Sequence, residues 1–222
     1  MGQSDEPDES QAFPPTYHAR LGEQIKPAVL SAVVLTLLTG GVFPLLLFAL
    51  ARPLFPQQAR GSLLRLGGVV IGSKLIAQEF TQPRYFQPRP SAAGNGYDGT
   101  ASGGTNLGPN NPKLLNGSAD FAGIRQLADE YRQRNGLALG TSIPVDAVTR
   151  SGSGLDPHIS LANALLQLPR VARARGLSEQ VVRELVMGHL EGRQFGILGS
   201  PRVSVLELNL AIDEIASPQR LR

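Results

Sequence analysis

The sequence predicts an α+β protein with one N-terminal transmembrane helix, followed by a soluble domain that combines a small sheet with several helices. Three observations support this fold class. An uncharged apolar run covers residues 27–51, two β-prone runs meet at Gly67-Gly68, and apolar residues recur at helical spacing between residues 119 and 189. A small sheet packed against helices is the economical assembly for this mixture of elements.

The uncharged run is the clearest single feature, since 25 consecutive residues carry no charged side chain. As a helix it would be about 37 Å long, enough to cross a hydrocarbon core of about 30 Å. Gly40, Gly41 and Pro44 weaken a helix in water but are tolerated in membrane spans. Ala49-Leu50-Ala51 resembles a signal cleavage site, but the run is longer than the apolar part of a signal peptide, which is about 7–15 residues. We therefore expect an uncleaved membrane anchor.

This anchor divides the chain into three regions. Residues 1–26 are expected to form a disordered N-terminal tail, because residues 1–24 are polar and acidic. Residues 27–51 form the transmembrane helix, and residues 52–222 form the soluble domain. Basic residues flank the span on both sides, so the charge pattern leaves its orientation open.

The first half of the soluble domain begins with a hairpin. The runs Ser62–Leu66 and Val69–Ile76 are β-prone, and Gly67-Gly68 between them suits a primed turn. From Gln82 to Asn116 the chain is rich in proline, glycine, asparagine and serine. Loops of that length are usually functional or disordered.

The second half is expected to be mainly helical. Capping residues and helical apolar spacing mark most of the expected elements. The elements are a helix from about Ala119 to Asn135 with Ser118 as N-cap, a loop over Thr149–Ile159, a helix over Leu161–Leu168, a further short helix from Pro169 to Gly176, a helix after the N-cap Ser178, and a buried strand over Arg202–Ile212.

The composition excludes several classes of site. The chain has 222 residues, a formal net charge of +3, no cysteine and three histidines. The absence of cysteine rules out disulfide scaffolds, thiolate metal sites and cysteine nucleophiles, and so few histidines argue against a histidine-rich metal centre. Basic residues are spread thinly through the soluble domain, whereas a nucleic-acid groove needs clustered positive charge.

Two groups of residues have a structural interpretation. Arg170, Arg173 and Arg175 lie at helical spacing, and we interpret them as a solvated helix face. His189 lies on an apolar helix face, which is typical of a core or interface histidine. Neither group indicates a site.

Two glycine-rich motifs resemble phosphate-binding loops. Gly94–Gly99 has the glycine spacing of a dinucleotide-binding fingerprint, but no strand precedes it and no helix follows it. Residues 103–109 lack the Gly-Lys-Ser/Thr of a P-loop. Both are interpreted as turns.

The segment from Ser151 to Ser160 brings serine, aspartate and histidine together. A hydrolytic triad needs a serine oriented by histidine and a histidine oriented by a carboxylate. The nucleophile-elbow pattern is absent, because position 151 is serine where glycine is required. Asp156 before Pro157 favours an Asx-turn instead, with His158 and Ser160 capping the next helix.

Several long motifs occur in a fixed order along the chain. They are FTQPRYFQPRPSA from Phe80, SGGTNLGPNNP from Ser102, VDAVTRSGSGLDPHIS from Val145, RVARARGL from Arg170 and PRVSVLELNLA from Pro201. Together with the single N-terminal span, they resemble the C subunit (KdpC) family of the bacterial Kdp potassium-transporting ATPase. The resemblance covers residues 25–213.

The resemblance implies a non-catalytic accessory subunit of a high-affinity, ATP-driven potassium import complex. Such a subunit is needed for assembly and stability, and is proposed to promote ATP binding by the catalytic subunit. The implied partners are a potassium-channel-like subunit, a P-type ATPase catalytic subunit, a small single-span subunit and membrane lipid, with no nucleic acid. The implied location is the bacterial inner membrane, with a cytoplasmic N-terminus and a periplasmic soluble domain.

No catalytic, metal-binding or cofactor-binding residue is expected, and ATP and potassium are expected to act at the level of the complex. The loops that include the SGGTNLGPNNP and SGSGLDPHIS motifs are candidates for partner contact or structural support. The candidate residues are Asn106, Gly108, Pro109, Ser151, Gly152, Ser153, Gly154, Asp156 and His158. The alternative is a membrane-anchored periplasmic hydrolase that uses Ser151 or Ser153 with His158.

Overall fold

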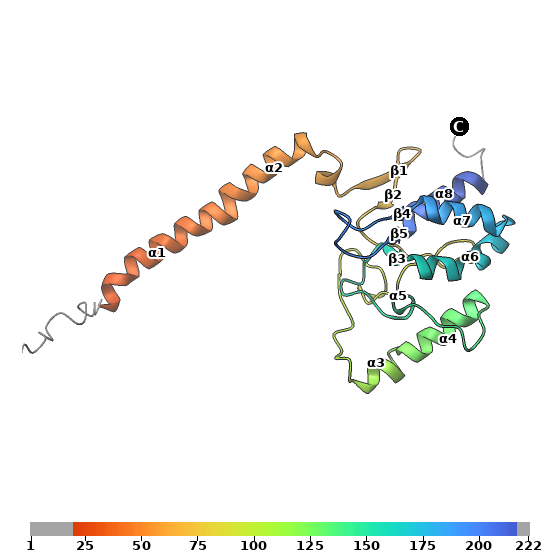
Figure 1. Cartoon of the computed structure of the whole chain (residues 1–222). Helices are drawn as coiled ribbons and strands as arrows, with labels where there is room; N and C mark the ends of the chain where they lie inside the picture. Colours follow the sequence, from red (N-terminus) through yellow and green to blue (C-terminus); the bar gives the residue numbers. More distant parts are fainter. Residues whose placement is uncertain (1–19, 217–222) are drawn as a thin grey trace, which may run out of the picture. The chain divides into compact units, whose positions relative to one another are not determined.

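The computed structural model describes residues 20–216 and divides into two compact units, one ending at Ala59 and one beginning at Arg60 (Figure 1). It confirms the α+β class with one apolar N-terminal helix. The predicted tail falls mostly on residues 1–19, which lie outside the described residues. Residues 21–26, assigned to the tail from the sequence, are helical.

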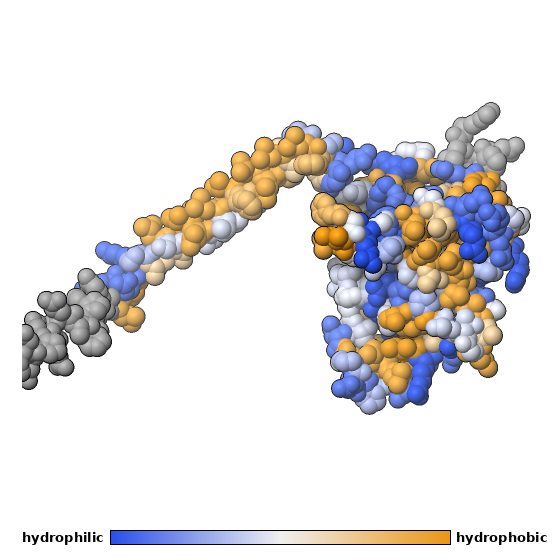
Figure 2. Space-filling model, in the orientation of Figure 1, coloured by the Kyte–Doolittle hydropathy of each residue, from blue (hydrophilic) through white to orange (hydrophobic). Residues whose placement is uncertain are grey.

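The first unit contains one apolar helix of 34 residues, Leu21–Leu54. It consists of α1 (Leu21–Leu37), a π-helical turn η2 (Leu38–Val42) and α2 (Phe43–Leu54). Hydrophobic residues cover most of its length, and none of its residues is buried (Figure 2). At about 1.5 Å per residue it is about 50 Å long, so it is long enough to cross a membrane.

The π-helical turn has a local cause. Pro44 lacks the N–H that would bond the carbonyl of Gly40, and its ring crowds the preceding turn. Gly40 and Gly41 have low helix propensity and adapt easily to the wider turn. The helix therefore changes its hydrogen-bond pattern at this point without ending.

A 3₁₀ turn, η3 (Gln58–Arg60), ends at Arg60, which is the first residue of the second unit. The predicted hairpin follows it. Strands β1 (Leu63–Leu66) and β2 (Val69–Ser73) pair antiparallel, with Leu66 opposite Val69. Gly67 and Gly68 have φ values of 56° and 83°, as a primed two-residue turn requires. The hairpin is confirmed, although β2 ends at Ser73 and not at Ile76.

A second sheet has three short antiparallel strands in the order β3-β5-β4. These are β3 (His158–Ser160), β4 (Leu190–Glu191) and β5 (Arg202–Ser204). Three helices lie together beside this sheet, namely α6 (Leu161–Arg175), α7 (Glu179–Gly188) and α8 (Val205–Ala216) (Figure 1). The helices, the sheet and Phe86 form the main core, in which burying each Val, Leu, Ile or Phe side chain stabilises the fold by about 1.5–3 kcal/mol. The core consists of Phe86, Ile159, Ala164, Leu168, Val171, Ala172, Val182, Val186, Val203, Val205, Leu208 and Ile212.

The predicted strand over Arg202–Ile212 is wrong beyond Ser204. Helix α8 (Val205–Ala216) begins directly after β5. Alternating aliphatic residues in this segment imitate a strand, but the most deeply buried positions, Val205, Leu208, Asn209 and Ile212, repeat with helical spacing. The short apolar run therefore did not distinguish a buried strand from a buried helix.

The predicted break at Pro169 is also wrong. Helix α6 (Leu161–Arg175) is continuous through it. Ser160 caps the helix by accepting from Asn163 N at 3.1 Å, and Gly176 ends it in the left-handed conformation. The neighbouring helix α7 (Glu179–Gly188) has the predicted N-cap Ser178.

Of the remaining helices, α3 and α5 were not predicted and the third differs from its predicted bounds. Helix α3 (Pro112–Asn116) lies in the segment predicted to be a loop, and α5 is Val145–Val148. Helix α4 (Ile124–Asn135) begins after the predicted start at Ala119, because Ser118 and Phe121 form a bridge across a turn. Its N-terminal cap is at Gly123, whose N–H donates to Gln126 Oε1 at 2.8 Å.

Candidate functional site

The second unit is organised around a segment without helix or strand, Phe80–Pro90, that makes one turn over Gln82–Tyr85 and then passes beside helices α6 and α8. We call it the extended segment. At Phe86 the side-chain amide of Asn209 takes the place of a neighbouring strand. Asn209 Oδ1 accepts from Phe86 N and Asn209 Nδ2 donates to Phe86 O, both at 2.8 Å. Gln167 does the same at Gln87, accepting from its N–H at 2.8 Å and donating to its carbonyl at 3.0 Å. Side chains from two helices thus provide hydrogen-bond partners for buried backbone N–H and C=O groups that no neighbouring strand pairs with.

Arg170 completes this network from α6. It is buried and donates to Tyr85 O at 2.9 Å, to Asn135 Oδ1 at 2.8 Å, to Gln167 Oε1 at 2.8 Å and to Pro83 O. Burial lowers the pKa of its guanidinium to about 10. Because that value is well above neutral pH, Arg170 remains a cation held by carbonyl and amide oxygens.

The interpretation of the arginine cluster as a solvated face is therefore wrong for two of its members. Only Arg173 is exposed. The side chain of Arg175 is 6% exposed, pairs with Asp213 at 2.6 Å and lies over the ring of Tyr85 at 4.7 Å. The pattern of charge at helical spacing could not reveal that backbone carbonyls face this side of the helix.

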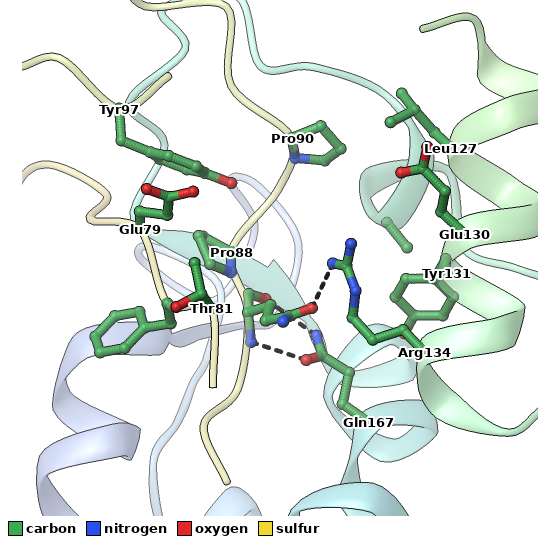
Figure 3. Close-up of a pocket in the computed structure, with 13 residues that line it drawn as sticks. Glu79, Thr81, Pro88, Pro90, Tyr97, Leu127, Glu130, Tyr131, Arg134 and Gln167 are labelled. Carbon is green, nitrogen blue, oxygen red and sulfur yellow. Dashed lines mark hydrogen bonds between the residues drawn. The ribbon is translucent and has the colours of Figure 1, made fainter. Parts of the chain in front are cut away.

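A polar pocket of ≈ 310 Å³ lies between the extended segment and helix α4 (Figure 3). Figure 3 shows Pro88, Pro90 and Tyr97 on one side of it, and Leu127, Glu130, Tyr131 and Arg134 projecting from α4 on the other. Arg134 crosses the gap and donates to Gln87 Oε1 at 2.7 Å.

Both tyrosines of this pocket are held as neutral hydrogen-bond donors. Burial, with a contribution from the charge of Glu79, raises the pKa of Tyr97 to about 12, and its hydroxyl donates to Arg89 O at 2.8 Å. Burial also raises the pKa of Tyr131, whose hydroxyl donates to Asn163 Oδ1 at 2.8 Å. Phenols with raised pKa values that donate to protein oxygens are suited to positioning neighbouring groups. They are not activated bases.

The predicted residues of the SGSGLDPHIS motif lie in a second place, where two long loops pack together. The carbonyl of Ser153 accepts from Ser102 Oγ and from Gly103 N, both at 2.9 Å. The carbonyl of Gly154 accepts from Ser91 Oγ at 2.6 Å. Gly154 has φ +71°, and a Cβ there would lie 2.6 Å from Ala93 N, so only glycine permits this approach. Residues 91–104 and 151–155 therefore form one interlocked layer, which we call the loop layer.

Asp156 and His158 lie at one edge of the loop layer. Asp156 Oδ1 accepts from His158 N at 3.0 Å, which confirms the predicted Asx-turn. Arg89 pairs with the other carboxylate oxygen at 2.9 Å. Burial alone would raise the pKa of Asp156, but hydrogen bonds from His158 and Arg89 outweigh it and lower the pKa to about 2.

The ring of His158 faces two carboxylates. Its Nδ1 is 3.5 Å from Asp156 and its Nε2 is 3.6 Å from Glu191, which also pairs with Arg202 at 3.0 Å. His158 does not cap α6, so that part of the prediction is wrong, whereas the capping by Ser160 is confirmed. The open surface recess beside His158 has a volume of ≈ 450 Å³.

The two serines proposed for a triad are engaged inside their own loop. Ser151 is buried and its Oγ accepts from Asp156 N at 3.4 Å, while Ser153 Oγ accepts from Leu155 N at 3.1 Å. Within residues 20–216, no hydrogen bond joins either hydroxyl to His158. In the same range, no group of three or more His, Cys, Asp and Glu side chains is placed to hold a metal ion.

The other predicted residues lie on a neighbouring exposed turn. Asn106 has a φ of 53°, and Gly108 O accepts from Asn111 N at 3.0 Å just before α3. Gly108 and Pro109 are exposed, as is Gly152 in the loop layer. Among the described residues no hydrogen bond joins Asn106, Gly108 or Pro109 to Ser151–His158, so the structure does not assemble the candidates into one site.

Sequence reasoning missed the residues that hold the extended segment. Asn163, Gln167 and Arg170 share one face of α6, at positions i, i+4 and i+7, and all three are buried. Polar side chains repeating on a face that also contains buried aliphatic residues were the available signal. That signal gives no indication of the partner, because the extended segment lies about eighty residues earlier in the chain.

Comparison with known proteins identifies the family. The family model KdpC, described as the K⁺-transporting ATPase c chain, matches residues 25–214. The chain belongs to the KdpC family. A potassium-transporting ATPase KdpC subunit of Koribacter versatilis is 51% identical over 186 residues, which cover 84% of this chain and 92% of the relative. KdpC subunits of Mycobacterium tuberculosis and Geobacter metallireducens are 49% and 47% identical, each across 86% of this chain and 98% of the relative.

Proposed function

We propose that this chain is a non-catalytic accessory subunit of a high-affinity, ATP-driven potassium import complex, and that it supports the assembly and stability of that complex. Family membership supports the place in a potassium-transporting ATPase. The apolar helix supports a role that is anchored in the membrane.

One observation carries the non-catalytic role. The serine and histidine side chains that could serve a hydrolase already bind other groups of the loop layer or its edge. Ser151 and Ser153 accept hydrogen bonds from backbone amides, and His158 lies between two carboxylates. A nucleophile needs a base within hydrogen-bond reach, and these serines have backbone amides as partners. The same bonds hold the layer in one shape, which suits a surface that docks on another protein.

The partners in this proposal are a potassium-channel-like subunit, a P-type ATPase catalytic subunit and a small single-span subunit. The apolar helix packs beside the channel-like subunit in the inner membrane. The N-terminus is cytoplasmic, and the second unit is periplasmic, where its loops 82–116 and 149–160 contact the outer mouth. From that side, any promotion of ATP binding would pass through the complex and not through direct contact with ATP.

A truncation tests the assembly role. The chain is ended after Ala59, which keeps the apolar helix and removes the second unit. We expect the complex to lose stability in detergent and to dissociate during purification. A matched control, Leu139→Ser, changes a side chain that is 86% exposed and outside the loop layer, and should leave assembly intact. Full assembly and potassium transport by the truncated form would refute the proposal.

The membrane-anchored hydrolase is the competing function. It predicts that the purified full chain turns over an ester or amide substrate and that His158→Ala abolishes this turnover. Our proposal expects no turnover in either protein. Protease accessibility in spheroplasts is the companion measurement, because cleavage of the second unit from outside is expected, and its protection would contradict the periplasmic placement.

A further inference from the structure

The β1–β2 hairpin exposes more apolar surface than a soluble sheet normally does. Leu63, Leu66, Val69 and Val70 have exposed fractions of 45%, 47%, 67% and 44%. The last residues of β1 and the first residues of β2 are exposed on both faces of the ribbon. An antiparallel hairpin in water usually keeps one face polar, so the tip of this hairpin lacks a covering element among the described residues.

Among residues 20–216, the side-chain bonds that fasten the hairpin lie near its base. Lys74 pairs with Glu207 of α8, Ser73 Oγ donates to Gly61 O at 2.7 Å, and Gln78 donates to Ile71 O at 2.9 Å. A groove of ≈ 380 Å³ lies between the strands and α8. Leu66 lines this groove, whereas the turn Gly67-Gly68 is exposed and Val69 is 67% exposed, so the turn end of the hairpin is open to the surroundings.

The chain segment that contains the hairpin carries only basic charges. Residues 52–78 contain four basic residues and no acidic residue. Arg52 ends the apolar helix, while Arg60 and Arg65 are exposed beside the hairpin. Arg65 shares the groove with Asp213 and Glu214 of α8, but within residues 20–216 neither Arg60 nor Arg65 forms an ion pair. Exposed aliphatic residues beside arginines are the pattern by which surface elements bind anionic lipid headgroups.

The covalent chain places a bilayer within reach of the hairpin. The apolar helix ends at Leu54 and β1 begins at Leu63. Nine residue steps span at most about 30 Å when fully extended. An element tethered this closely to a membrane span meets a high local concentration of lipid headgroups, which lowers the entropic cost of a second contact.

We propose that the tip of the β1–β2 hairpin, Leu66–Val69, inserts into the headgroup region of the bilayer crossed by the apolar helix. Leu66 and Val69 enter the boundary between headgroups and acyl chains, and Arg60 and Arg65 bind lipid phosphates. The hairpin is then a second membrane contact of the second unit. The proposal requires the membrane anchor but not the role in assembly, so the two fail independently.

The test uses the absence of tryptophan from the chain. Val69→Trp introduces a single fluorescent reporter at the tip, where an aromatic residue suits a strand. The full chain is reconstituted without other subunits into vesicles of phosphatidylcholine and phosphatidylglycerol at about 2:1, a composition with an anionic surface. Half of the preparations contain phospholipids brominated near the top of the acyl chains, which quench only a nearby indole. The matched control is Leu139→Trp, at a site 86% exposed in the same unit.

We expect brominated lipid to reduce the emission of V69W about twofold and to shift its maximum to shorter wavelength, because the indole enters the interface. The emission of L139W should remain unquenched and typical of water. Should V69W fold poorly, Leu66→Trp reports from the paired position on β1. Water-like, unquenched emission from a folded tip variant overturns the proposal. So does a tip that becomes shielded only after other subunits of the complex are added, since its occupant is then a protein.

The charges provide a second arm of the experiment. In the V69W chain, the double change Arg60→Glu and Arg65→Glu should reduce the quenching about twofold in anionic vesicles, because each basic residue near the surface strengthens binding. In pure phosphatidylcholine the same change should have little effect. Quenching that is unaffected by the reversal in anionic vesicles overturns the headgroup contact by the arginines.

Discussion

The hairpin and the extended segment Phe80–Pro90 show that regular backbone pairing and burial are separate properties. The hairpin has its own antiparallel backbone ladder, with one shift of register between Leu64 and Arg65, and its side chains are exposed. The extended segment has no strand, yet Phe86 is fully buried and its backbone is bonded by Asn209. The difference lies in where the partners come from. The ladder of the hairpin is local, whereas the segment depends on helices from the C-terminal half of the chain.

The largest expected effect tests whether the extended segment belongs to the core. Phe86→Ala should lower the free energy of unfolding by about 3–5 kcal/mol, because it removes a fully buried ring and leaves a cavity. The control Phe195→Ala removes a ring that is 90% exposed and should change stability by less than about 0.5 kcal/mol. Denaturant unfolding of the full chain in detergent, followed by tyrosine fluorescence, measures both. Equal effects would show that the segment does not belong to the core.

A smaller loss is expected when the side-chain clamp is removed and the ring is kept. Asn209→Leu preserves volume but leaves both Phe86 N and Phe86 O without a partner. Because an unsatisfied buried backbone group costs about 1–3 kcal/mol, we expect a loss of about 2–4 kcal/mol. Gln133→Leu, on the exposed face of α4, is the control. If N209L unfolds at the same denaturant concentration as the native chain, the amide is not replacing a strand.

The sequence predicted the elements whose signals are local. The apolar helix, the Gly67-Gly68 hairpin and the Ser178 and Ser160 caps each depend on neighbouring residues, and all are present. The helix α8 was missed because its aliphatic residues fit both periods over a short run. The helix α6 was expected to break because proline usually ends a helix, but a single missing N–H is tolerated where packing holds both halves.

The candidate site was predictable only in part. The Asx-turn at Asp156 follows from two adjacent residues, and the structure confirms it. The loop layer joins Ser102 and Gly103 to Ser153, about fifty residues apart, and the buried amides of α6 contact a segment still more distant. No spacing in a single sequence encodes such contacts. They arise from tertiary packing, which local patterns do not specify.

Acidification should weaken the edge of the loop layer. The carboxyl of Asp156 has a pKa of about 2, below the ordinary value of 3.8. Because the pKa is lower in the folded than in the unfolded chain, the ionised carboxylate stabilises the fold at pH values above the unfolded pKa. This stabilisation is lost as the pH falls from about 4 to 2. The carboxylate is partly exposed, so we expect a loss of only about 1–2 kcal/mol through that window. Asp156→Asn should flatten this part of the stability curve, and an unchanged slope would show that Asp156 does not contribute to it.

The smallest expected effect completes the comparison. Val69→Ser at the hairpin tip removes an apolar side chain that is 67% exposed and contacts little of the described protein. Its loss should therefore change the free energy of unfolding in detergent-free solution by less than about 0.5 kcal/mol, in line with other exposed positions. For that measurement the second unit is excised proteolytically from the full chain, and its circular dichroism is first compared with that of the intact protein. A stability loss above 1 kcal/mol would mean that the tip packs against protein, and that the exposed aliphatic residues of the hairpin already have their partner within the chain.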